Sequence, residues 1–376
     1  MLKEMRILKY LLICLFAVAA FVEVDGQNTI KIGKPVALFT KGDNNIAEFR
    51  IPSMITTEKG TVIAVCDARV DRGGDVPNNI DLVMRKLGKG SKTWTPLKRI
   101  VNFAGKHGAA DPCLLQDRQT GRIFLFYAFC PGRNNVTEGP NRERRHLMVQ
   151  YVYSDDEGES WSNPIHVDYA LREDNWQSIW SAPGRGVQLK DGKLVVPCTI
   201  NKDTKVMATI LVYSDDHGKT WDKIEVAENI NEPQMVELSN GDWMINARNQ
   251  MEYRYCRAIT ISNDGGNSWS KPKGDLNLPD PNCQGSIIQH VFKINNKKKD
   301  LLILSNNNSK KGRKNISLSL SDDHGKTWKY KKQVYGGPSA YSCLTILPNG
   351  NIGLLYECGE KSPYEGIKYV EIELAN

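Results

Sequence analysis

The sequence repeats one eight-residue segment, and this repeat limits the possible folds more than any other feature does. Each full copy reads Ser-x-Asp-x-Gly-x-Ser/Thr-Trp, and the copies occupy residues 154–161, 214–221, 262–269 and 321–328. A fifth, degraded copy ends at Ser91-Lys-Thr93-Trp94 and has Lys89 at the aspartate position. Repetition of this kind is typical of propellers and solenoids, in which every copy belongs to one structural unit.

The residue types of the repeat are those of a tight turn between two strands. An aspartate side chain can accept hydrogen bonds from the turn backbone, glycine supplies a positive φ, and tryptophan packs as a large apolar plug. The alternating residues 147–153 before the first full copy are typical of a strand. We do not expect the turns to bind calcium, because they lack the regular oxygen ligands and closing glutamate of calcium loops.

The spacing of the copies predicts the architecture. They recur roughly every 58 residues, so the roughly 350 residues that follow the apolar N-terminal segment of this 376-residue chain hold six units. The 31 glycines and 17 prolines favour many short strands over long helices. We therefore predict an all-β fold, a six-bladed β-propeller of four-stranded antiparallel blades. The strand expected at residues 367–374 shares a blade with residues 29–38 and closes the ring.

The N-terminal segment has the layout of a secretory signal peptide. Lys3, Arg6 and Lys9 precede the apolar residues 10–22, a stretch too short for a membrane-spanning helix of about 20 residues. We expect a signal peptide over residues 1–26 and a single propeller domain over residues 27–376. The protein is then secreted or periplasmic, or extracellular or lysosomal in a eukaryote, without membrane insertion after cleavage.

The cysteine count limits the possible disulfides and metal sites, and the net charge limits the possible ligands. Eight cysteines follow the signal segment, which allows either one or two disulfides or buried single thiols. No Cys-x-x-Cys pair occurs, and we expect no metal site. The net charge of +7 is spread along the chain, which favours anionic ligands over nucleic acid.

One further motif gives the chain a family resemblance. Phe49-Arg50-Ile51-Pro52, followed by the four full repeats, resembles the sialidases (neuraminidases) of glycoside hydrolase family 33, whose repeats are called Asp boxes. The resemblance extends from about residue 47 to residue 373. It implies a sialidase propeller that removes terminal α-linked sialic acids from glycoproteins, gangliosides and oligosaccharides, acts as a monomer and needs no cofactor.

The substrate of such an enzyme carries a carboxylate on its anomeric carbon, and arginine is the planar, permanently charged partner for it. The resemblance implies three such arginines. They are Arg50, Arg248 at the end of Ile245-Asn-Ala-Arg248, and Arg313. It also implies that Glu357 orients the first of them.

The same carboxylate would repel a carboxylate nucleophile, whereas a neutral tyrosine hydroxyl avoids the repulsion. Tyrosine is a weak nucleophile at neutral pH, so a base must accept its proton. The resemblance implies that Tyr341 is the nucleophile and Glu232 its base. Glu237 is the competing candidate for the base.

A third group must protonate the leaving oxygen and later activate water. The resemblance assigns this role to Asp75, with Asp71 and Asp81 as rivals in the same loop. It places Arg69 and Asp111 around the sugar hydroxyls and the N-acyl group. Two alternatives use the same residues: a trans-sialidase, including an intramolecular one, and a catalytically silent propeller that binds sialic acid.

Overall fold

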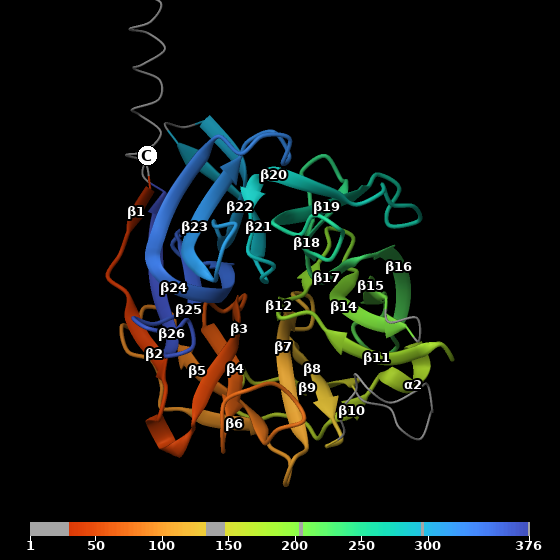
Figure 1. Cartoon of the computed structure of the whole chain (residues 1–376), viewed down its shortest axis with the longest axis vertical. Coiled ribbons are helices and arrows are strands. Elements are labelled where there is room, and N and C mark those ends of the chain that lie inside the picture. The colour runs from red at the N-terminus through yellow and green to blue at the C-terminus, as the bar shows by residue number, and fades with distance from the viewer. Residues whose placement is uncertain (1–29, 133–146, 203–205, 295–296, 375–376) are drawn as a thin grey trace, which may run out of the picture.

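The structure, a computed structural model, describes residues 30–132, 147–202, 206–294 and 297–374 (Figure 1). The predicted signal peptide over residues 1–26 lies outside these ranges. Within them, no helix is both long enough and apolar enough to cross a membrane.

The strands of the described chain form four hydrogen-bonded sheets, two of which each span two blades, so that six blades surround a centre (Figure 1). Only two short helical segments occur in the described residues, η1 (Asp43–Asn45) and α2 (Asp168–Leu171). The first blade consists of β3 (Glu48–Thr56), β4 (Val62–Arg69), β5 (Ile80–Leu87) and β6 (Lys98–Val101), and the second of β7 (Gly108–Gln116), β8 (Ile123–Cys130), β9 (Met148–Ser154) and β10 (Ile165–His166). The third consists of β11 (Trp176–Ser181), β13 (Val187–Gln188), β14 (Leu194–Lys202), β15 (Met207–Ser214) and β16 (Asp222–Glu228), whereas β12 (Gly184–Arg185) pairs in parallel with β7 of the second blade. The fourth consists of β17 (Ile230–Glu237), β18 (Trp243–Asn249), β19 (Cys256–Ser262) and β20 (Lys273–Pro279). The fifth consists of β21 (Ser286–Ile294), β22 (Lys297–Asn307), β23 (Lys314–Ser321) and the first half of β24 (Tyr330–Ile346). The last consists of the second half of β24 with β25 (Ile352–Cys358), β26 (Gly366–Leu374), β1 (Ile30–Ile32) and β2 (Val36–Thr40).

The last blade combines the two ends of the described chain. β26 pairs with β1 through Ile30 and Leu374, and with β2 through Val36 and Tyr369. The predicted pairing between the early strand and the strand at residues 367–374 is therefore confirmed.

Apolar side chains fill every interface between neighbouring blades. Six buried clusters each combine residues of two adjacent blades, and one of them joins the last blade to the first through residues such as Leu38, Phe49 and Cys343. Burial of alternating strand residues on both faces of each blade is what drives the sheets to stack around a ring. The predicted six-bladed β-propeller is confirmed.

Every Asp box forms the turn between the third and fourth strands of its blade. In the second box, Asp216 accepts hydrogen bonds from the Ser214 hydroxyl (2.8 Å) and the Thr220 backbone N–H (2.9 Å). Gly218 has a φ of 80°, and a Cβ atom there would lie 2.3 Å from the Phe124 ring. The turn therefore requires glycine both for its backbone conformation and for its close packing.

The alternation of strands places the boxes away from the predicted site residues. Successive strands of an antiparallel blade run in opposite directions. The start of the first strand, the end of the second and the start of the third therefore lie at one end of the propeller axis. The turn after the third strand lies at the opposite end. Arg50 is near the start of β3, and Arg248 is near the end of β18. These residues and the Asp boxes therefore lie at opposite ends of the propeller.

The cysteines settle one open alternative. All eight cysteines of the described residues are buried free thiols. Of the two possibilities, disulfides or buried single thiols, the described residues show the buried single thiols.

Candidate active site

The inner strands of four blades are distorted where the predicted site residues lie. Each has a β-bulge, which redirects side chains and is frequent beside active sites. The bulges fall between Arg50 and Ser53, Ala110 and Cys113, Asn231 and Gln234, and Ser339 and Ser342. Three bulges contain a positive-φ residue before a proline: Ile51 (60°), Asp111 (56°) and Glu232 (42°). This conformation is rare for non-glycine residues and rarer before proline, so the surrounding structure must impose it.

Glu357 connects two of these segments. Its buried carboxylate accepts hydrogen bonds from Arg50 Nε (2.7 Å), the Ile51 backbone N–H (2.7 Å) and the Tyr341 backbone N–H (3.1 Å). It therefore fixes the guanidinium of Arg50 and the backbone of two bulges at once. The ion pair also favours the charged arginine: burial lowers the pKa of Arg50, but Glu357 outweighs it and the net pKa is raised.

Tyr341 and Glu232 are in direct contact. The buried Tyr341 hydroxyl donates a short hydrogen bond to Glu232 Oε1, and Arg248 Nη1 lies 3.3 Å from the hydroxyl and 3.1 Å from the carboxylate. Burial and the neighbouring Glu232 carboxylate raise the pKa of Tyr341 well above its usual value. The phenol therefore stays protonated at neutral pH, with an acceptor for its proton already in place.

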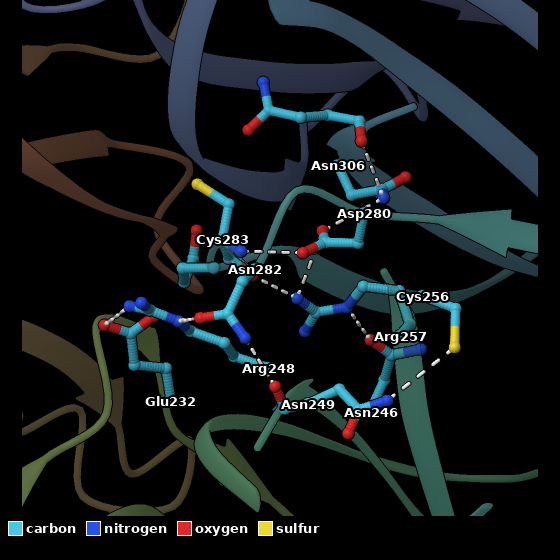
Figure 2. A network of polar contacts seen from close by, with 12 residues as sticks. Glu232, Asn246, Arg248, Asn249, Cys256, Arg257, Asp280, Asn282, Cys283 and Asn306 are labelled. Atoms are coloured by element: carbon cyan, nitrogen blue, oxygen red, sulfur yellow. Dashed lines mark hydrogen bonds and ion pairs between the residues drawn. The ribbon is translucent and has the colours of Figure 1, made fainter. Parts of the chain in front are cut away.

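A buried network behind Arg248 holds it in position (Figure 2). Arg248 Nε donates to Asn282 Oδ1 (2.7 Å), and Asn282 Nδ2 donates to the Asn249 backbone carbonyl. The turn that carries Asn282 is anchored by Asp280, which accepts from the Cys283 N–H (2.6 Å) and pairs with the fully buried Arg257 (3.5 Å). Arg257 in turn donates to Asn246 (2.8 Å) on the same strand as Arg248.

Arg313 has no acidic partner among the described residues. Its Nη1 donates to the hydroxyl of Tyr364 (3.0 Å), and its guanidinium carbon lies 5.3 Å from the centre of the Tyr341 ring. The Arg50 guanidinium lies at the same 5.3 Å from that ring and 4.0 Å from the ring of Tyr364. All three predicted arginines therefore surround Tyr341, and Tyr364 contacts two of them.

Arg69, on the strand β4 that pairs with β3, forms an ion pair with Asp75. Asp75 Oδ1 lies 2.6 Å from Arg69 Nη2, although the Asp75 side chain is 82% exposed, and Arg69 also contacts Glu48 (3.3 Å). Burial raises the pKa of Asp75, but Arg69, Arg50 and Arg313 outweigh it and the net pKa is lowered. In this arrangement the Asp75 carboxyl group is ionised.

Asp111 has the opposite electrostatic environment. Burial and the nearby Glu232 and Asp75 carboxylates raise its pKa to about 8. Its backbone N–H donates to Asp67 Oδ1 (3.1 Å), and its carbonyl accepts from Ser181 (2.7 Å). The positive φ and these two contacts aim the Asp111 side chain at the group that contains Glu232 and Asp75.

The three rival residues are engaged elsewhere. Glu237 accepts from the Lys190 backbone N–H (2.8 Å) at the other end of β17. Asp71 accepts from Asn79 (3.0 Å) within the loop, and Asp81 pairs with Arg99 (3.3 Å) at the start of β5. The structure brings Asp75 and Glu232 to the arginine cluster, and none of the rivals.

Sequence reasoning missed several residues that shape the site. Tyr364, Asn282 and Asp67 lie outside the motifs, and each reaches the site only through contacts between distant segments. One signal was available for the bulges. A proline directly follows Ile51, Asp111 and Glu232 in three predicted inner strands, where proline disrupts regular pairing.

Comparison with known proteins gives the family. Residues 72–354 match the BNR repeat-like domain family. A sialidase of Bacteroides fragilis (strain YCH46) is 33% identical over 90% of this chain, and the match covers 65% of that protein. The chain thus spans slightly less than two thirds of this relative's length.

Two solved structures have the same fold. Hadza microbial sialidase Hz136 superposes with a TM-score of 0.80 and 28% identity, over 89% of this chain and 67% of that chain. The intramolecular trans-sialidase from Ruminococcus gnavus superposes with a TM-score of 0.78 and 22% identity, over 90% and 97% of the two chains. The repeat-family match, the 33% identity to the Bacteroides fragilis sialidase and the likeness to Hz136 together show that the chain belongs to the sialidase family of β-propellers.

Proposed function

We propose that the protein is a retaining exo-α-sialidase that hydrolyses terminal α-linked sialic acids from glycoproteins, glycolipids and oligosaccharides. One observation carries the proposal: the Tyr341 hydroxyl donates to Glu232 at the centre of three arginines. A phenol with a ready proton acceptor is a nucleophile, and the surrounding cations match a substrate whose reacting carbon carries a carboxylate.

Substrate binding uses the arginines. Arg313, which has no acidic partner among the described residues, is free to pair with the sialoside carboxylate, while Glu357 and Glu232 hold Arg50 and Arg248 in place for it. Fixing the guanidinium groups beforehand lowers the entropy lost on binding and aims the anomeric carbon at Tyr341.

The first chemical step forms a bond between the Tyr341 oxygen and the anomeric carbon and breaks the glycosidic bond. Glu232 takes the tyrosine proton, and Asp75 gives a proton to the leaving oxygen. In the second step, Asp75 takes a proton from water, the water oxygen bonds to the same carbon, and the bond from that carbon to the Tyr341 oxygen breaks. The tyrosine oxygen then regains its proton from Glu232. Two displacements at one carbon retain its configuration.

The charge environment of Asp75 suggests how it becomes an acid. Arg50 and Arg313 help to lower its pKa, and both are the proposed partners of the substrate carboxylate. A bound carboxylate neutralises part of their charge, so the pKa of Asp75 rises when substrate binds. Binding would thereby prepare the proton donor that the first step needs.

A trans-sialidase is the second candidate, because one neighbour of the same fold is described as an intramolecular trans-sialidase. Incubation with 4-methylumbelliferyl sialoside, followed by mass analysis of the released sugar, distinguishes the two. Hydrolysis gives free sialic acid, whereas intramolecular transfer gives an anhydro sugar lighter by one water. The absence of fluorophore release by the folded protein would contradict both and favour a silent sialic-acid-binding propeller.

We also infer that residues 1–26 are a cleaved signal peptide and that residues 27–376 act as one exported, monomeric catalytic domain. The basic and apolar pattern of residues 3–22 supports the first part. N-terminal sequencing and light scattering of the protein recovered from the exported fraction would test both parts.

A further inference from the structure

The guanidinium of Arg185 lies in the centre of the propeller and has no acidic partner among the described residues. It lies in β12, beside Leu114 of β7, and Figure 1 shows β12 next to the middle of the ring. Its Nε atom is buried without a hydrogen-bond partner, and no carboxylate of the described chain forms an ion pair with it. Buried charges are usually paired, because an isolated one loses its hydration without compensation.

The backbone that carries Arg185 is fixed by three other blades. Ser53 Oγ donates to the Gly184 carbonyl (2.5 Å), while Gln234 and Gln284 both donate to the Pro183 carbonyl (3.1 and 3.2 Å). The backbone next to Arg185 is therefore fixed near the centre of the ring.

A cavity of about 470 Å³ contains Arg185. The cavity is at the ends of the inner strands β3, β7 and β24, on the side of the Asp boxes, and its lining includes Lys89, Arg118 and one carboxylate, Glu58. Arg118 already donates to Gln188 and to the Leu189 carbonyl. The cavity lining thus carries three cations and one carboxylate, and neither Arg185 nor Lys89 has a side-chain hydrogen bond or ion pair among the described residues.

The cavity is separate from the catalytic arginines. Arg50 is near the start of β3 and Thr56 at its end, so roughly 20 Å of strand lies between Arg50 and the part of the cavity lining formed by Thr56. Arg185 nevertheless shares one property with Arg313 of the candidate active site: each is a guanidinium held in place with no acidic partner in the described chain.

We propose that this cavity is a second, non-catalytic anion site, in which Arg185 binds a small oxyanion such as phosphate, sulfate or a carboxylate group. The anion supplies the counter-charge that the fold leaves out, and the planar guanidinium matches two of its oxygens. Because such a ligand binds the folded chain and not the unfolded one, it raises the unfolding temperature.

The test measures the unfolding temperature of the full chain in chloride, phosphate, sulfate and citrate at matched ionic strength. For the wild type we expect a rise of about 3–5 °C with the preferred oxyanion over chloride. Phosphate and sulfate also stabilise proteins generally by exclusion from their surfaces, so the informative quantity is the difference between variants. The anion for which the rise in unfolding temperature differs most between the wild type and the variants is the class of oxyanion that the cavity binds.

Arg185→Gln should lose the specific rise. Arg122→Gln removes an equal charge from an exposed arginine that pairs with Asp155, and it should keep the rise. Arg313→Gln should keep it as well, because the catalytic site is at the other end of the ring. An equal rise in Arg185→Gln, or a rise lost only in Arg313→Gln, would overturn the proposal.

Folding of the variants provides a further check. In chloride, Arg185→Gln should unfold at or above the wild-type temperature, because the substitution removes a partly buried guanidinium that has no acidic partner among the described residues. If it unfolds at a lower temperature there, Arg185 is stabilised by the protein itself and the proposal is wrong. Arg185→Lys keeps the charge without the planar fork, and calorimetry should show weaker binding of the same anion than in the wild type.

Discussion

Tyr364 links two arginines of the site although it belongs to no motif. Its ring lies 4.0 Å from the Arg50 guanidinium carbon, and its hydroxyl accepts a hydrogen bond from Arg313. Glu357 supplies the charge for Arg50, whereas Arg313 has only this neutral acceptor in the described chain. Tyr364 thereby orients Arg313 without cancelling the charge that a bound carboxylate needs.

Tyr364→Phe should weaken binding of an inhibitor that carries a carboxylate, such as a dehydrated sialic acid analogue. Loss of one hydrogen bond costs about 1 kcal/mol, which corresponds to an inhibition constant about fivefold higher. Tyr364→Leu also removes the cation–π contact with Arg50 and should weaken binding further. The exposed Tyr330→Phe is the matched control. Inhibition unchanged in both Tyr364 variants would show that the contact does not position the arginines.

Asp111 should make the stability of the protein depend on pH. Its pKa is about 8 in the folded state, mainly through burial, and about 3.9 in an unfolded chain. At a pH between these two pKa values, the Asp111 side chain is therefore protonated in the folded protein and ionised in the unfolded chain. This contribution to stability is complete below pH 4 and is lost as the pH rises to about 8.

Asp111→Asn removes this dependence. The unfolding temperature of the variant, relative to the wild type, should increase between pH 5 and pH 8 and then level off. The exposed Asp43→Asn should show a difference that stays constant over the same range. A constant difference for Asp111→Asn would contradict the raised pKa of this side chain.

At the residue scale, sequence motifs led to the residues that we propose for the chemistry but not to those that hold them in position. Arg50, Arg248 and Tyr341 belong to segments with recognisable neighbours. Tyr364 and Asn282 do not, because their positions depend on which distant loops meet in the folded ring. A single sequence contains no local pattern for such contacts.

At the element scale, the Asp boxes were predictable because their function is local. In the second box, the hydrogen bonds of Asp216 stay within a few residues, and its pKa is lowered to about 2 mainly by the Thr220 hydroxyl and backbone N–H. The bulges were not predicted, because a positive φ at Ile51 or Glu232 is imposed by partners from other blades. The double role of β24, which closes one blade and begins the next, likewise depends on the whole ring.

Asp216→Ala should lower the free energy of unfolding by about 1–2 kcal/mol through lost turn hydrogen bonds. The Michaelis constant should stay near the wild-type value, because the box lies at the other end of the propeller. The neighbouring Asp215→Ala, which removes only an exposed contact with Lys193, is the control and should change stability by less than about 0.5 kcal/mol. Equal destabilisation by both would mean that the turn does not depend on Asp216.

At the scale of the whole molecule, the ring brings residues from several blades to one point. Arg50 comes from the first blade, Glu232 and Arg248 from the fourth, and Tyr341 from the strand that enters the last. The period of the repeats predicted the number of blades and the pairing of the chain ends. It could not predict the cavity around Arg185, which exists only because the inner strands converge.

The central claim is that Tyr341 attacks the sialoside, and Tyr341→Phe tests it most directly. The variant keeps the aromatic ring beside Arg50 and Arg313 but has no hydroxyl to donate to Glu232. Sialoside binding, measured by calorimetry, should persist, while kcat for 4-methylumbelliferyl sialoside falls by several orders of magnitude. Proton NMR of the wild-type reaction should show the α-anomer first. Wild-type turnover by Tyr341→Phe, with the β-anomer appearing first, would contradict the account.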